Sequence, residues 1–97
     1  MGINNEFNMV KEFQKAFNNP YEEKPKLMGM ERALKRYSWM QEEIDEFIEA
    51  TQEGDLVEQA DAMLDVIYFA LGTLVELGVE PEPLFAIVQK ANMNKLA

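Results

Sequence analysis

Turn-forming residues divide this chain of 97 residues into four segments, and they limit its fold more than any other feature. Glycine, asparagine and proline at these positions end one helix or begin the next. The breaking residues are Asn18-Asn19-Pro20, Gly54-Asp55, Gly78 and Pro81. Between them, apolar residues recur at helical spacing. The predicted helices span residues 7–17, 31–53, 56–77 and 82–92, with a loop at residues 18–29.

The short turn at residues 54–55 predicts that the two longest helices form an antiparallel hairpin. A chain of this length forms one domain, residues 1–97, with a modest core. Four short helices leave more apolar surface than they can cover. We therefore expect an all-α, four-helix bundle-like chain built around the hairpin and completed by oligomerisation, most simply as a homodimer.

Composition excludes several classes of protein. Apolar residues make up 47% of the chain, which is too many for a disordered protein. A net charge of −9 argues against binding of a nucleic-acid polymer or an anionic membrane. The chain has no cysteine and no histidine, so thiolate nucleophiles and histidine bases are excluded. Without a visible secretory signal or membrane span, we expect a cytoplasmic protein.

Acidic residues are concentrated where basic residues are missing. Between Arg36 and Lys90 there are thirteen Asp and Glu residues and no Lys, Arg or His. A solvated helix usually alternates the two signs of charge, because oppositely charged residues four apart attract each other. An acidic, solubilising surface is the simplest interpretation. The positions of the acids on each helix test that interpretation.

The helix predicted at residues 56–77 is apolar around most of its circumference, which is typical of a buried helix. Its polar positions form one narrow stripe: Glu58, Asp61, Asp65, Gly72 and Glu76. An unpaired carboxylate inside a protein costs several kcal/mol or becomes protonated. We therefore expect these acids to point inward, and a bound cation is the simplest compensation for their charge.

The preceding helix offers a matching pair of carboxylates. Glu43 lies within its apolar face and Glu46 at the edge of that face, three residues apart, as are Glu58 and Asp61. An antiparallel hairpin can bring the two pairs together. Oxygen donors alone suit Mg²⁺, Mn²⁺ or Ca²⁺, whereas a di-iron bundle needs histidine and an EF-hand needs a different loop. The sequence predicts a Mg²⁺ site, with Mn²⁺ as an alternative.

These residues resemble a known family. Glu42-Glu43-Ile44-Asp45-Glu46 and Glu58-Gln59-Ala60-Asp61 look like the EExxE…ExxD signature of the all-α nucleotide pyrophosphohydrolases, the MazG-like superfamily. Arg36, Asp65-Val66-Ile67-Tyr68 and Asn92-Met93-Asn94-Lys95 are similar to its phosphoribosyl-ATP pyrophosphohydrolase-like subgroup. The resemblance covers most of the chain. It also makes a homotetramer a second possible assembly.

The resemblance implies Mg²⁺-dependent hydrolysis of a nucleoside triphosphate, or of a phosphoribosyl-ATP-like nucleotide, to the monophosphate and pyrophosphate. It assigns the metal to Glu43, Glu46, Glu58 and Asp61. Glu42 is implied as an additional ligand or as a residue that positions the attacking water. The alternatives are a catalytically inactive helical module that binds a nucleotide or metal, and an acidic dimerisation domain.

An acidic site needs cations to hold a triphosphate. Arg36 lies about two turns before Glu43 on the same face, and Lys95 and then Lys90 can reach in from the last segment, from the same or another subunit. Asp65 is a candidate contact for the sugar or for a water molecule. The side-chain amides of Asn92 and Asn94 are candidate contacts to the substrate. For each cation the alternative is an ordinary surface position. Trp39, Phe13 and Phe17 can stack on a base, although aromatic residues at helical spacing usually form core.

Overall fold

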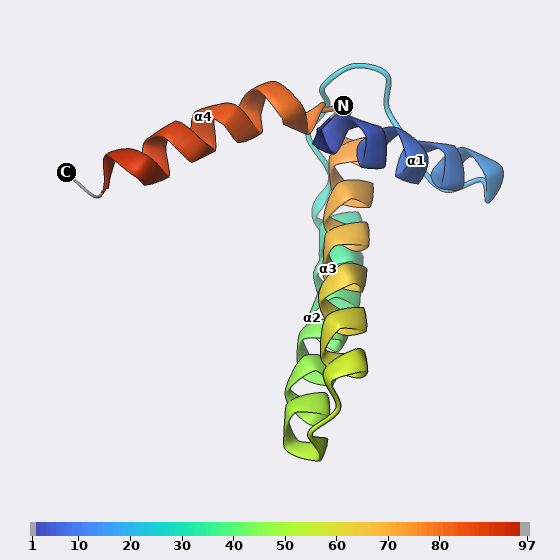
Figure 1. Cartoon of the computed structure of the whole chain (residues 1–97). Helices are drawn as coiled ribbons and strands as arrows, with labels where there is room; N and C mark the ends of the chain where they lie inside the picture. The colour runs from blue at the N-terminus through green and yellow to red at the C-terminus, as the bar shows by residue number, and fades with distance from the viewer. Residues whose placement is uncertain (1, 96–97) are drawn as a thin grey trace. The chain divides into compact units, whose positions relative to one another are not determined.

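The computed structural model describes residues 2–95, which form four helices and contain no strand. The helices are α1 (Ile3–Ala16), α2 (Met30–Glu53), α3 (Leu56–Leu77) and α4 (Pro81–Asn94) (Figure 1). The prediction of an all-α chain is confirmed. The residues group into two compact units, described separately below. We call residues 27–73 the hairpin unit, and residues 2–26 with 74–95 the terminal unit.

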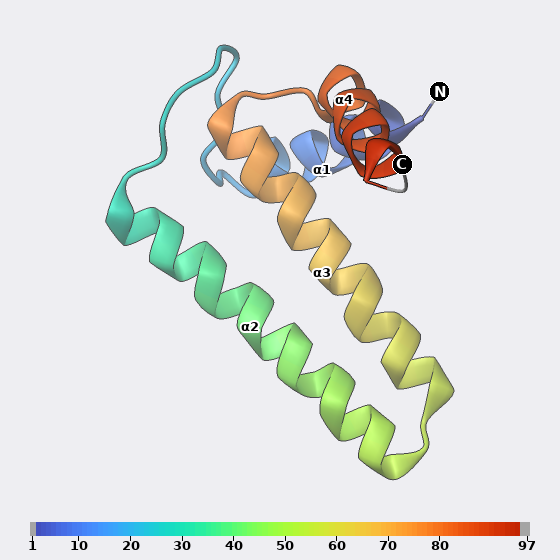
Figure 2. The ribbon, with the colours of Figure 1, turned by 90° about the vertical axis from the view of Figure 1, so that its left-hand side faces the viewer.

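The turn between α2 and α3 has the structure that its sequence predicts. Gly54 adopts a left-handed conformation with φ 68°, which glycine tolerates without steric cost. The N–H of Asp55 donates to the carbonyl of Ala50 at 2.9 Å, and the N–H of Gly54 donates to the carbonyl of Thr51 at 3.2 Å. These are the two hydrogen bonds of a Schellman motif. Oδ1 of Asp55 then accepts the N–H of Glu58 at 3.0 Å and caps α3. The two helices therefore run antiparallel (Figure 2).

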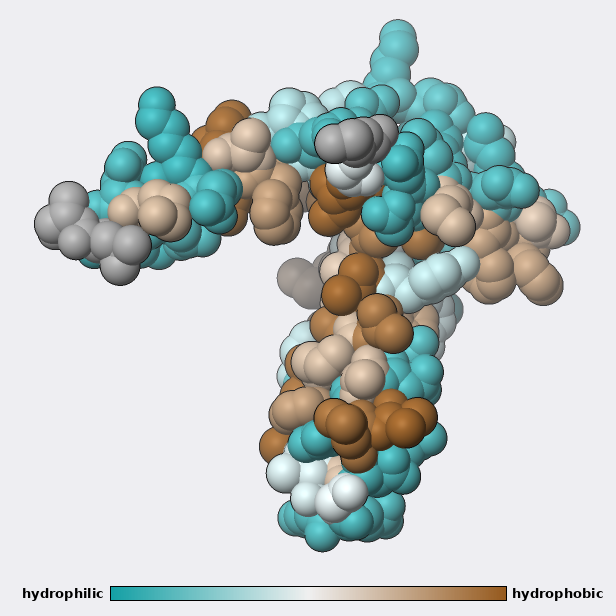
Figure 3. Space-filling model, viewed as in Figure 1, coloured by the Kyte–Doolittle hydropathy of each residue, from teal (hydrophilic) through white to brown (hydrophobic). Residues whose placement is uncertain are grey.

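The seam of the hairpin unit contains both small and large side chains. Ala50 and Ala62 are buried, and the rings of Trp39 and Phe69 stack with centroids 6.0 Å apart. The outer surfaces are different, because Tyr37, Ile44, Ile48, Leu64 and Ile67 are all exposed. Figure 3 shows apolar side chains gathered on the outside of this hairpin. The prediction that α3 is buried nearly all round is wrong for the single chain, since one neighbouring helix covers only one side of it.

In the terminal unit, α1 buries one face. Phe7, Val10 and Gln14 are buried at helical spacing. α1 begins at Ile3, four residues earlier than predicted, although no side chain caps its first turn. Nε2 of Gln14 donates to the carbonyl of Pro20 at 3.0 Å and to Oε2 of Glu76 at 3.3 Å. These bonds satisfy a polar side chain in the interior of the unit.

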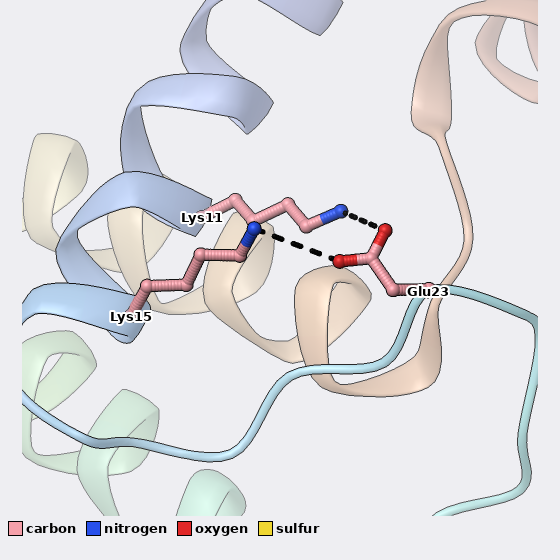
Figure 4. A network of polar contacts seen from close by, with 3 residues as sticks. All are labelled: Lys11, Lys15 and Glu23. Atoms are coloured by element: carbon pink, nitrogen blue, oxygen red, sulfur yellow. Dashed lines mark hydrogen bonds and ion pairs between the residues drawn. The ribbon is translucent and has the colours of Figure 1, made fainter.

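The segment after α1 is held by backbone and charged contacts. The N–H groups of Glu22 and Lys26 donate to the carbonyls of Val75 at 3.1 Å and Leu77 at 2.8 Å. Nζ of Lys11 and of Lys15 lie 3.0 and 3.6 Å from the carboxylate of Glu23 (Figure 4). The hydrogen bond and charge of Lys11, with the charge of Lys15, lower the pKa of Glu23. The predicted loop is therefore an ordered connection.

α4 begins at Pro81, which occupies the first turn as predicted. Oδ1 of Asn4 accepts the N–H of Glu82 at 3.1 Å, which connects the start of α4 to α1. Residues 82–95 are exposed, including Leu84, Phe85, Ile87 and Val88. No single helix within residues 2–95 is long and apolar enough to span a membrane, and α3 and α4 reach such a composition only as a pair broken by a bend.

Candidate active site

Glu43 has the most unusual environment among the carboxylates of the hairpin unit. It is half-buried on α2, and its Oε2 atom is fully buried without a hydrogen-bond partner among the described residues. Burial, followed by the nearby carboxylates of Glu46 and Asp65, raises the pKa of Glu43 from 4.5 to about 7. A buried oxygen with no donor in reach is a position where a cation is favourable.

The other predicted ligands surround Glu43 less closely than the sequence predicts. Asp65 is half-buried, whereas Glu46, Glu58 and Asp61 are exposed. Of the acids predicted to point inward, Glu43 and Asp65 are half-buried and Glu76 is buried, whereas these three are exposed. These three side chains leave the seam where a single partner helix does not cover them. Glu42, the predicted helper in water positioning, is exposed.

Carboxylates from both helices nevertheless line one cleft. Glu46, Glu49 and Glu53 of α2 and Glu58 of α3 surround a space of about 210 Å³, with Ala50 at its base. One predicted metal ligand from each helix, Glu46 of α2 and Glu58 of α3, therefore lines the same cleft. The hairpin turn explains the meeting, because it pairs the last turns of α2 with the first turns of α3.

The donor set suits a hard divalent ion, although it is not assembled around one point. Every candidate ligand is a carboxylate, which is the ligand that Mg²⁺ and Mn²⁺ favour. Among residues 2–95, no three acidic side chains converge closely enough to hold a metal ion as they stand. Negative charges without a cation repel one another, so long glutamate side chains turn apart. To hold a metal ion, these carboxylates would have to lie closer together than they do here.

Arg36, the predicted phosphate contact, is one of the most buried charged residues of α2, with 4% of its surface exposed. Its guanidinium lies against Gly72 of α3, where a Cβ atom would come within 2.8 Å of Nη1. The carbon Cζ of Arg36 lies 5.3 Å from the centre of the Trp39 ring. Arg36 also borders a cavity of about 320 Å³ that includes Tyr37, Met40 and Thr73. Trp39 stacks on Phe69 in this hairpin, and its predicted stacking on a base stays a prediction.

Arg32 is a cation near this site that sequence reasoning missed. Its Cζ lies 5.1 Å from the centre of the same Trp39 ring, and it is half-buried. The spacing of Arg32, Arg36 and Trp39 at i, i+4 and i+7 was the available signal, because these positions share one helix face.

The remaining predicted contacts lie on α4 in the terminal unit. Lys90, Asn92 and Asn94 are exposed, as is Lys95. Nζ of Lys95 donates to Oδ1 of Asn92 at 3.1 Å, so these two residues form one polar cluster at the end of the helix. Their role in substrate binding stays a prediction.

No individually curated protein matches the chain. A family model, that of phosphoribosyl-ATP pyrophosphohydrolase, matches residues 10–92. The match includes the whole hairpin unit, with both carboxylate motifs, the second half of α1 and most of α4. The resemblance expected from Glu42–Glu46 and Glu58–Asp61 is thereby confirmed at the level of the family. The chain belongs to the phosphoribosyl-ATP pyrophosphohydrolase family, whose members are hydrolases that act on acid anhydrides.

Proposed function

We propose that this protein hydrolyses phosphoribosyl-ATP, or a similar nucleoside triphosphate, to the monophosphate and pyrophosphate in a Mg²⁺-dependent reaction. The observation that supports this most directly is the buried, unpartnered oxygen of Glu43, in a hairpin whose sequence contains no Lys or Arg after Arg36. Family membership supports the reaction class. A structural dimerisation domain would need neither a buried, unpartnered carboxylate oxygen nor membership of a hydrolase family.

In this proposal Glu43, Glu46, Glu58 and Asp61 hold the ion, with Mn²⁺ as a possible substitute. Asp65 lies close enough to Glu43 to raise its pKa and is available as a further oxygen donor. A bound divalent ion supplies charge neutralisation for the triphosphate and acidifies water.

The chain's own residues then position the reactants. Glu42 stands next to Glu43 and orients the attacking water, which adds to phosphorus while the bond to pyrophosphate breaks. The proton that the water releases passes to the carboxylate of Glu42 or Glu43. Arg36 and Lys95 bind phosphate oxygens, and Asp65 and Asn92 bind the nucleoside. Holding the reactants in line contributes much of the acceleration in phosphoryl transfer.

We also propose that the working form is a homodimer or a homotetramer. Exposed apolar residues on α2, α3 and α4 support this: Tyr37, Ile44, Ile48, Leu64, Ile67, Leu84, Phe85, Ile87 and Val88. Surfaces of this kind are rare on monomers and typical of interfaces. A second copy is the simplest partner, because a two-fold dimer covers the same surface on both subunits.

Pyrophosphate release from a panel of nucleotides tests the function. The panel contains phosphoribosyl-ATP, ribonucleoside and deoxyribonucleoside triphosphates, each with Mg²⁺, Mn²⁺ or EDTA. We expect release from at least one nucleotide only with a divalent ion, and a loss of about 100-fold or more in Glu43→Gln and Glu58→Gln. Glu12→Gln is the matched control, because Glu12 is exposed on α1 in the terminal unit.

The alternative is an inactive module that binds a nucleotide or a metal. Such a module shows a metal-dependent rise in melting temperature without turnover of any nucleotide. Full activity in Glu43→Gln and Glu58→Gln would contradict the assigned site but leave the reaction class standing.

A further inference from the structure

Two arginines of α2 converge on one tryptophan. The guanidinium carbons of Arg32 and Arg36 lie over the Trp39 ring, at 5.1 and 5.3 Å from its centre. Each is about 5 Å from the same point, so the two carbons are at most about 10 Å apart. The face of an aromatic ring attracts cations. Trp39 therefore contacts both guanidinium groups and places them near each other.

The partners on α3 hold this arrangement in place. Phe69 stacks with Trp39 at 6.0 Å, and Gly72 leaves room for the guanidinium of Arg36. Arg36 is 4% exposed, whereas Arg32 is only half-buried. Of the two, Arg32 is therefore the more accessible to a ligand, and Arg36 is the more rigid.

This arginine pair lies on α2 before the carboxylates. A helix rises 1.5 Å per residue, so Arg36 precedes Glu43 by roughly 10 Å along the axis and Arg32 by roughly 16 Å. Arg32, Trp39, Glu43 and Glu46 share one side of α2 by helical spacing. One side of the hairpin thus has a cationic end and an acidic end.

Phosphate groups match the cationic end. A guanidinium offers a planar set of donors that binds phosphate oxygens in pairs. Two guanidinium groups also carry twice the positive charge of one. The proposed substrate carries phosphates in two places: phosphoribosyl-ATP has a sugar phosphate besides its triphosphate. A divalent ion held at the acidic end would neutralise the phosphates near the reacting bond, and the arginines would then serve a phosphate farther along the molecule.

We propose that Arg32 and Arg36, held on Trp39, form a second phosphate-binding site that recognises a phosphate group of the substrate away from the reacting bond. Arg32 contacts the phosphate, and Trp39 acts as a positioning residue. This inference rests on the proposed function. The phosphate has two possible sources, the sugar phosphate of the phosphoribosyl group and the terminal phosphate of the triphosphate.

Steady-state kinetics of Arg32→Gln test the site. Lys35→Gln is the matched control, because Lys35 is exposed on the next turn and the substitution removes the same charge. We expect Arg32→Gln to raise KM for phosphoribosyl-ATP about tenfold or more with kcat changed less than about threefold, and Lys35→Gln to leave both near wild type. If ATP is affected equally, the terminal phosphate is the ligand. If only phosphoribosyl-ATP is affected, the sugar phosphate is the ligand.

Binding without metal separates this inference from the proposed function. Calorimetry in EDTA measures the affinity of phosphoribosyl-AMP, AMP and inorganic pyrophosphate for the intact protein, with no need for turnover. We expect tenfold or more weaker binding of phosphoribosyl-AMP, or of pyrophosphate, in Arg32→Gln and in Trp39→Leu, and rescue in Trp39→Phe, which keeps an aromatic face. Helical circular dichroism checks that each variant folds.

The outcomes are distinct. Absence of turnover with every nucleotide overturns the proposed function, while the binding experiment still tests the arginine site. Equal behaviour of Arg32→Gln and Lys35→Gln in both kinetics and binding overturns the arginine site, while turnover by the wild type keeps the function.

Discussion

Arg36 and Gly72 fit together across the hairpin: a Cβ atom at position 72 would lie 2.8 Å from Nη1 of the buried guanidinium. Glycine in the interior of a helix costs about 1 kcal/mol relative to alanine. In α3 this less favourable residue, Gly72, stands at the position against which the Arg36 side chain of α2 packs. The absence of a side chain at position 72 is therefore part of how Arg36 is held.

Gly72→Ala should fail to gain the stability that alanine normally gives a helix. We expect the free energy of unfolding to fall by about 1–2 kcal/mol, because the added methyl group displaces a buried guanidinium. Urea denaturation measures this. Gly29→Ala is the control, since its Cβ meets no atom within 4 Å and its φ is negative. A Gly72→Ala variant more stable than wild type would show that Arg36 moves aside freely.

Glu43 should make the metal-free protein less stable as the pH rises. Its pKa is about 7 in the folded chain, against 4.5 as the ordinary value, so between these pH values the folded state binds more protons. Stability therefore decreases as pH rises from about 4.5 to 7 and stays reduced above 7. Glu43→Gln removes this penalty.

Denaturation with urea in EDTA at pH 5 and pH 8 checks that expectation. We expect Glu43→Gln to be about 1–2 kcal/mol more stable than wild type at pH 8 and close to it at pH 5, where both side chains are largely neutral. This magnitude is below the full conversion of the shift because Glu43 is only half-buried. The same difference at both pH values would mean that the effect is packing and not charge.

Magnesium should stabilise the protein through the same carboxylates. A ligand that binds only the folded state at 100 times its Kd adds about 2.7 kcal/mol. For a chain of this size, such a gain raises the melting temperature by roughly 10 °C or more. Differential scanning fluorimetry with MgCl₂, against NaCl of equal ionic strength, measures the rise.

Substitution identifies which acids hold the ion. Glu46→Gln, Glu58→Gln and Asp61→Asn should each lose most of the Mg²⁺-dependent rise, whereas Glu12→Gln should keep it. Asp65→Asn belongs in the same series, because Asp65 is half-buried near Glu43 and Asp61 is exposed. An unchanged rise in Asp61→Asn with a loss in Asp65→Asn would move the fourth ligand from Asp61 to Asp65.

Local features of the fold were predictable from the sequence, because their causes are local. Gly54 and Asp55 make the hairpin turn with their own hydrogen bonds, and Pro81 begins α4 because its ring suits the first helical turn. The start of α1 was missed because no capping side chain marks it. The family was identifiable because the two carboxylate motifs are specific when both are present.

Orientation and long-range contacts were harder to predict. A helical wheel predicts that Glu46, Glu58 and Asp61 lie on or beside the inward faces, but it does not say how far a neighbouring helix covers them, and all three are exposed. Arg32 was overlooked because its contact with Trp39 spans two turns and depends on the reach of a long, flexible side chain. Such contacts follow from side-chain conformation, which spacing alone does not fix.

The apolar ridge of α4 should be an interface between copies of the chain. Leu84, Ile87 and Val88 lie at i, i+3 and i+4 and are exposed, with Ile87 at 64%. In a monomer, Ile87→Glu replaces an exposed side chain and costs little. In an oligomer it buries an unpaired charge, which should weaken association by about 100-fold or more.

Sedimentation velocity over a range of protein concentrations measures this effect. We expect wild type to sediment as a dimer or tetramer, Ile87→Glu to shift to smaller species, and Gln89→Glu, which adds the same charge at an exposed polar position of α4, to resemble wild type. A monomeric wild type at about 100 μM would contradict the oligomer, since interfaces of ordinary size associate well below that concentration. An oligomer unaffected by Ile87→Glu would instead place the interface on the exposed apolar residues of the hairpin, where Ile44→Glu and Ile48→Glu provide the next test.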